Sequence, residues 1–93
     1  MVFRNFIAVF TIAAKVRCMM TPEQCKAARG LLRMTQDDLA AKTGLTSVTI
    51  RKFENRTGPL RDATINLIKL TLESAGIEFI DENGGGPGVR LKG

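Results

Sequence analysis

The sequence predicts a mainly α-helical domain that ends in a β-hairpin, and two observations support this fold class. Three threonines, Thr21, Thr35 and Thr46, each stand before a short segment with apolar residues at helical spacing. After Gly76 the pattern changes to two short strand-like segments around a glycine-rich stretch. The chain has 93 residues, which is the size of one domain.

The first helix is expected over residues 22–32. Thr21 can cap it, Pro22 suits its first position, and Gln24 occupies the capping-box position. The i, i+3, i+7 spacing places three residues on its inward face: Cys25, Ala28 and Leu32. Two basic residues, Lys26 and Arg29, are expected to face solvent. Cys25 is therefore interpreted as a small core residue rather than a reactive thiol.

Two further helices are expected around a tight turn at Gly44. The Thr35 hydroxyl can accept a hydrogen bond from the Asp38 amide, so the second helix begins after Thr35. Glycine supplies the positive φ that such a turn needs, and Thr46 then opens the third helix. Four residues are expected to be inward: Leu39, Ala40, Ile50 and Phe53.

The sequence after residue 55 predicts a loop, a fourth helix and a hairpin. Gly58-Pro59 marks the loop, and Asp62 is expected to cap a helix over residues 63–75. Its inner stripe is predicted to be Ile65, Ile68, Leu72 and Ala75. Leu67 and Leu70 form a second apolar edge, either core or a dimer contact. The hairpin strands are expected over residues 77–80 and 89–92.

Residues 1–19 form an apolar extension that has several interpretations. The segment is rich in Val, Ile, Phe and Thr, which favours a strand, and Met20 offers an alternative start that would make it dispensable. Lys15 and Arg17 directly after the apolar run argue against a secretory signal, and the run is too short to span a membrane. The predicted units are residues 1–19, a helical domain over 20–76 and a hairpin over 77–93.

Composition argues against catalysis and for a polyanionic partner. The chain has no histidine and two cysteines, so it offers no Ser-His-Asp triad and no His-ligated or four-cysteine metal site. We expect no enzyme activity, cofactor or metal. The net charge is +5, and the densest basic stretch, residues 51–61, contains Glu54 as its single acid.

Two short helices around a glycine turn suggest a helix-turn-helix unit, which places its second helix in the major groove of DNA. The wider pattern is Thr35-Gln36, Leu39-Ala40, Gly44, Ile50 and Phe53-Glu54-Asn55. This pattern resembles the phage-repressor-like (Cro/repressor, XRE-type) helix-turn-helix family, and the resemblance spans residues 21–75. It implies a four-to-five-helix bundle that binds operator DNA as a dimer. The hairpin, and residues 1–19 if they form a strand, would be additions to that bundle.

The resemblance also implies roles for individual residues. Gln36 is expected at a phosphate; Thr46, Ser47 and Val48 in the groove; and Lys52 one turn further on the same face. Arg51, Asn55 and Arg56 are expected near the DNA backbone. Glu54 is expected to brace the fold through a basic side chain or backbone. Many relatives have glycine at the position of Arg56, which leaves the shape of the following loop open.

The predicted function is a sequence-specific transcriptional regulator, a repressor or autoregulator that binds a palindromic operator as a homodimer. The expected location is the cytoplasm, at the nucleoid, without a membrane association. Two alternatives keep the fold: the antitoxin of a toxin–antitoxin pair, and an anti-activator or assembly module that binds protein only. Salt-dependent DNA binding would separate the regulator from the protein-binding module.

Overall fold

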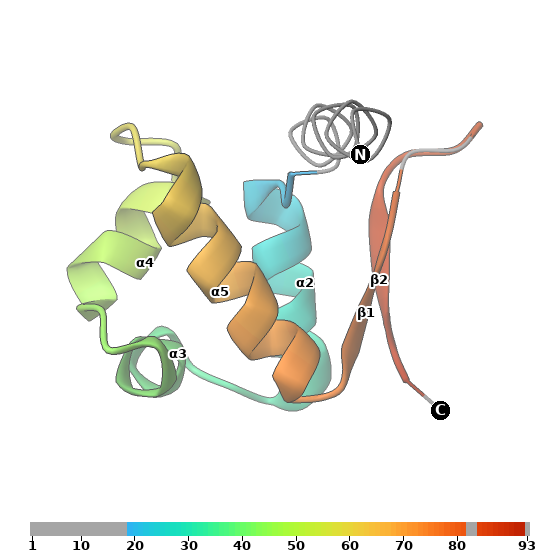
Figure 1. Cartoon of the computed structure of the whole chain (residues 1–93), viewed down its shortest axis with the longest axis horizontal. Coiled ribbons are helices and arrows are strands. Elements are labelled where there is room, and N and C mark those ends of the chain that lie inside the picture. Colours follow the sequence, from blue (N-terminus) through green and yellow to red (C-terminus); the bar gives the residue numbers. More distant parts are fainter. Residues whose placement is uncertain (1–18, 82–83, 93) are drawn as a thin grey trace, which may run out of the picture.

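The computed structural model describes residues 19–81 and 84–92. Within this part of the chain, four helices and a two-stranded hairpin follow one another (Figure 1). Their bounds are α2 Pro22–Leu32, α3 Gln36–Thr43, α4 Ser47–Glu54, α5 Asp62–Ser74, β1 Ile77–Ile80 and β2 Gly88–Leu91. The predictions for residues 1–18 lie outside the described residues. The predicted mainly α-helical fold with a C-terminal hairpin is confirmed.

The three predicted threonine caps are confirmed. The hydroxyls of Thr21, Thr35 and Thr46 accept hydrogen bonds from the amides three residues on, at 3.0–3.2 Å. At Thr21 and Thr35 the bond is reciprocal, because the side chains of Gln24 and Asp38 accept from the capping residues' own amides. Helices of eight residues such as α3 and α4 are marginal alone. The caps and the core together therefore stabilise them.

The core lies where α2, α3, α4, α5 and the start of β1 meet. Its fully buried large side chains are Leu39, Ile50, Ile68, Leu72 and Ile77, with Cys25 among them. Two predictions for α5 were wrong. Ala75 is exposed because it lies after the last turn, where the chain bends toward β1. Asp62 is the first residue of α5 rather than its cap, and Arg61 occupies the cap position without a side-chain hydrogen bond.

The hairpin is tied to α2 by the side chain of Gln24. Strand β2 begins at Gly88, one residue earlier than predicted, and it pairs antiparallel with β1 so that Ile80 lies opposite Gly88. The buried Gln24 Nε2 donates to the Gly88 carbonyl at 2.9 Å and to the Ile80 carbonyl at 3.4 Å. Figure 1 shows the hairpin at one end of the molecule and α3 and α4 at the other. The far end from the hairpin therefore presents the two helices around Gly44.

Candidate nucleic-acid interface

The turn between α3 and α4 has the backbone geometry that the sequence predicts. Gly44 has φ 77°, in the left-handed region that glycine tolerates without strain. The Leu45 amide donates to the Ala40 carbonyl at 3.1 Å, and the Thr43 hydroxyl donates to the Leu39 carbonyl at 2.9 Å. These bonds satisfy the end of α3 and set the direction in which α4 begins.

Helix α4 is divided into a buried stripe and a polar face. Ile50 and Phe53 point into the core, with 0% and 7% of their surface exposed. The opposite face carries Val48, which is 50% exposed, together with three exposed polar residues: Arg51, Lys52 and Asn55. Because residues three and four apart share a helix face, this arrangement presents one apolar and several polar groups outward. Such a face can read base edges and contact phosphates.

The predicted N-terminal contacts of α4 occupy the start of that face. Thr46 is exposed, and its hydroxyl both accepts from the Thr49 amide and lies 3.0 Å from the Thr49 hydroxyl. Ser47 is half-buried at the first helical position. The structure therefore brings Thr46, Ser47 and Val48 together at the N-terminal tip of α4. Thr49, for which no role was predicted, lies next to Thr46.

Glu54 is the centre of a buried polar network between α2, α3 and α4. The residue is 2% exposed. Its carboxylate accepts hydrogen bonds from Arg29, from Gln36 Nε2 at 3.0 Å and from the Cys25 thiol at 3.2 Å. Burial alone would raise the pKa of Glu54, but these donors outweigh it and hold the pKa below the usual range. Burial, with the neighbouring carboxylate, raises the pKa of Cys25 strongly, so its thiol stays protonated. The predicted bracing role of Glu54 is confirmed.

Arg29 corrects the prediction that it faces solvent. Its side chain is 18% exposed, and it forms two contacts of 2.6 Å with the Glu54 carboxylate. Its Nη1 also donates to the Met34 carbonyl at 3.0 Å. The sequence spacing could have predicted this burial, because Arg29 lies four residues after the buried Cys25 and so shares its helix face. A basic residue on an apolar face was the sign of a buried partner.

Gln36 and Arg56, two predicted contacts, have side chains engaged within the protein. Gln36 opens α3, so its backbone amide belongs to the helix N-terminus, while its side-chain amide donates to Glu54. Arg56 has φ 56° and its Nη2 lies 2.6 Å from Glu23 Oε1 on α2. The loop after α4 thus adopts the left-handed turn for which glycine is usual, with arginine in that position.

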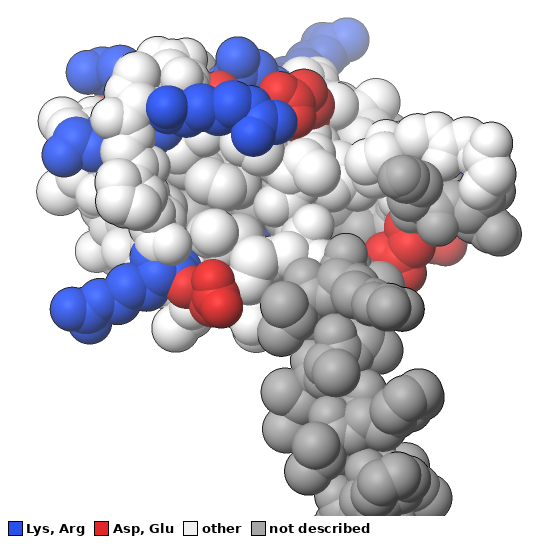
Figure 2. All heavy atoms as spheres, turned by 90° about the horizontal axis from the view of Figure 1, so that it is seen from above, with Lys and Arg blue, Asp and Glu red and all other residues white. Residues whose placement is uncertain are grey.

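The basic character of the surface follows from where Glu54 lies. The exposed residues of the stretch 51–61 include Arg51, Lys52, Arg56 and Arg61, whereas its one acid is buried and paired with Arg29. Seen from above, most of the visible Lys and Arg side chains lie on the half of the molecule that carries α4 (Figure 2). A polyanion would meet this half first.

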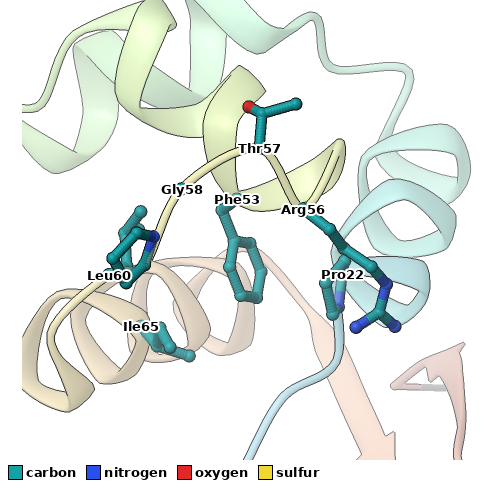
Figure 3. Close-up of a pocket in the computed structure, with 8 residues that line it drawn as sticks. Pro22, Phe53, Arg56, Thr57, Gly58, Leu60 and Ile65 are labelled. Atoms are coloured by element: carbon teal, nitrogen blue, oxygen red, sulfur yellow. The ribbon is translucent and has the colours of Figure 1, made fainter.

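An open, mainly apolar groove lies beside the basic stretch (Figure 3). Its walls come from the start of α2, the end of α4, the loop after it and the start of α5. The side chains of Pro22, Phe53, Leu60 and Ile65 line it, and Arg56 lies at its edge next to Pro22.

In the described part of the chain, no group of three or more His, Cys, Asp or Glu residues is arranged so that it could hold a metal ion. None of the helices described is long and apolar enough to cross a bilayer.

The fold and the exposed face of α4 define a class: DNA-binding proteins that present a helix-turn-helix. Comparison with protein families gives the same result, because the helix-turn-helix family model matches residues 26–70, from within α2 to within α5. No curated protein matches the sequence. The match supports a helix-turn-helix domain of the Cro/repressor-like, XRE type and, with it, a DNA-binding regulator of that type.

Proposed function

We propose that the protein is a sequence-specific repressor or autoregulator that reads the major groove with α4. The observation that carries this proposal is the exposed face of α4. Val48 is half exposed and Lys52 is exposed there, while Ile50 and Phe53 anchor the helix in the core. The major groove, about 12 Å wide, admits one helix. Val48 suits a thymine methyl group, and Lys52 can donate to guanine O6 or N7.

The remaining proposed contacts surround this helix. Three residues are assigned to phosphates: Gln36 at the start of α3, Arg51 on the exposed face of α4, and Asn55 at the C-terminal end of α4. Thr46 and Ser47 hydroxyls serve either a phosphate or a base edge. Since Gln36 donates its side chain to Glu54, we assign its phosphate contact to the backbone amide at the N-terminus of α3.

We further propose that the protein binds its operator as a homodimer. One α4 reaches only a few base pairs, and two copies on a palindrome would contact half-sites about 34 Å apart. Two features offer a surface for the second copy. Leu67 and Leu70 are 40% and 60% exposed on one side of α5, and Leu91 on β2 is 49% exposed. An exposed hairpin also leaves strand edges that pairing would cover.

The test is selection of bound duplexes from a random library, followed by measurement of affinity against salt. A regulator of this kind enriches a palindromic motif, and contact with about five phosphates gives a slope of log affinity against log salt near −4 to −5. Absence of binding at low salt would refute the proposal. In that case the anti-activator or assembly module that binds protein only becomes the function to test, with the exposed leucines as its contact surface.

A further inference from the structure

We propose that Glu23 restrains DNA binding by holding Arg56 away from the phosphates, an inference that rests on the proposed function. The two side chains form an exposed ion pair between α2 and the loop after α4, with Arg56 Nη2 2.6 Å from Glu23 Oε1. Their side chains are 62% and 67% exposed, so the pair stands at the surface rather than in the core. Glu23 is thus a positioning residue that acts through Arg56.

The backbone at the end of α4 explains how Arg56 reaches α2. The Arg56 amide donates to the Phe53 carbonyl at 3.2 Å, and the Thr57 amide donates to the Lys52 carbonyl at 3.0 Å. This is the Schellman pattern, which requires the left-handed conformation that Arg56 adopts with φ 56°. The conformation turns the Arg56 side chain back toward Pro22 and the start of α2 (Figure 3).

The Glu23 carboxyl group is ionised at neutral pH. A backbone hydrogen bond in the first turn of α2 and the hydrogen bond with Arg56 hold the pKa of Glu23 below its usual range. The carboxylate therefore competes with a DNA phosphate for the same guanidinium. Both are oxyanions that can accept two parallel hydrogen bonds from arginine.

Arg56 lies close enough to the proposed DNA face for this competition to matter. The loop of residues 56–58 folds against Lys52, whose Cδ would lie 3.7 Å from a Cβ placed on Gly58. Lys52 is the outward residue that we assign to the groove. A guanidinium released from Glu23 at this position can contact the phosphates that flank the bases under Lys52. In the free protein, one of the four exposed cations between residues 51 and 61 is therefore withheld.

The experiment measures binding of the full chain to a random-sequence duplex of about 30 base pairs, from about 50 to about 200 mM salt. The variants are Glu23→Gln, Arg56→Gln and the double variant. Glu78→Gln is the matched control, because it also removes one carboxylate from an exposed arginine pair, Glu78–Arg90 at 2.8 Å, but on the hairpin. Circular dichroism confirms that each variant is folded.

We expect Glu23→Gln to tighten binding about three- to tenfold at low salt and to steepen the salt slope by about one, the contribution of one phosphate contact. Glu78→Gln should change affinity less than about twofold. Arg56→Gln should have little effect alone but should abolish the gain in the Glu23→Gln background.

Two results would overturn the inference while leaving the proposed function intact. One is a Glu23→Gln protein that binds no more tightly than Glu78→Gln. The other is an Arg56→Gln protein that loses as much affinity in the wild-type background as in the Glu23→Gln background, which would show that Arg56 contacts DNA despite Glu23. A wild-type protein that does not bind DNA at low salt overturns both the proposed function and this inference.

Discussion

Arg29 on α2 holds both carboxylate oxygens of Glu54 on α4: Nε lies 2.6 Å from Oε2, and Nη2 lies 2.6 Å from Oε1. The Glu54 side chain has no exposed surface, and that of Arg29 is 18% exposed. The pair joins residues 25 positions apart, and it fixes the end of the exposed α4 helix against the first helix of the domain. The orientation of α4 therefore depends on a charge pair as well as on Ile50 and Phe53.

Replacing Arg29 should destabilise the protein strongly. Arg29→Met leaves the Glu54 carboxylate buried with Gln36 and Cys25 as donors but without a counter-charge, and the expected loss is about 3–5 kcal/mol of unfolding free energy. Urea denaturation measures it. Arg90→Met, which breaks an exposed pair of the same type, should change the unfolding free energy by less than about 1 kcal/mol. Equal losses of unfolding free energy in the two variants would show that the buried ion pair stabilises the protein no more than the exposed one.

Acidification should weaken the fold through Glu54. The pKa of Glu54 is lower in the folded protein than the value of about 4.3 for an unfolded glutamate, so folding favours the ionised form. Its contribution to stability is complete above about pH 4.3 and is lost as the pH falls through the folded pKa. The unfolding free energy of Glu54→Gln should therefore fall less between pH 7 and pH 3 than that of the wild type. Glu78→Gln keeps Glu54, and a flattened profile in that control instead would contradict the assignment.

Gln24 should contribute to both α2 and the hairpin. Gln24→Met removes the acceptor for the Thr21 amide and the donor to the Ile80 and Gly88 carbonyls, with an expected loss of about 1–3 kcal/mol. Gln24→Glu keeps the acceptor but places a buried carboxylate against two carbonyl oxygens. At neutral pH it should be the less stable variant, and it should recover relative to Gln24→Met as the pH approaches 4. Equal pH profiles for the two variants would argue against the contact with the hairpin.

Lys52 and Gln36 should affect DNA binding in different ways. Lys52→Ala should weaken binding to the selected operator by about 1–3 kcal/mol and relax sequence preference locally. Gln36→Ala keeps the backbone amide that we assign to the phosphate, so it should change the affinity for selected and random duplexes less than about twofold. Fluorescence anisotropy on selected and random duplexes measures both. Because Gln36 also donates to Glu54, the unfolding free energy of the Gln36→Ala variant is the necessary control. An equal loss on both duplexes for Lys52→Ala would refute its base-reading role.

The helix starts and the central turn could be predicted from the sequence because each depends on local chemistry. Threonine caps act on amides three residues away, and the left-handed turn at Gly44 needs only the absence of a Cβ. The hairpin was predictable for the same reason, from the change of period after Gly76. The errors in element bounds concern Asp62, Ala75 and the first residue of β2, where competing contacts decide the boundary.

The long-range pairs of the site could not be predicted in the same way. Arg29 meets Glu54 across 25 residues, Arg56 meets Glu23 across 33, and Gln24 meets Gly88 across 64. Each pair depends on how the helices and the hairpin pack against one another, which no local pattern encodes. The resemblance implied that Glu54 pairs with a basic side chain or the backbone, but it named no partner. The DNA contacts themselves stay predictions that the experiments above address.

The bonds from Gln24 also make the hairpin a practical place for engineering. They hold the Ile80 and Gly88 carbonyls, the last pair before the two strands separate, so the strands are anchored to α2 at the point where the connecting segment leaves them. Doubling the length of a flexible connection adds only about 0.6 kcal/mol of closure entropy. A peptide tag or a fluorophore-bearing insert grafted between these two residues would report on the protein while leaving α4, at the opposite end of the molecule, untouched.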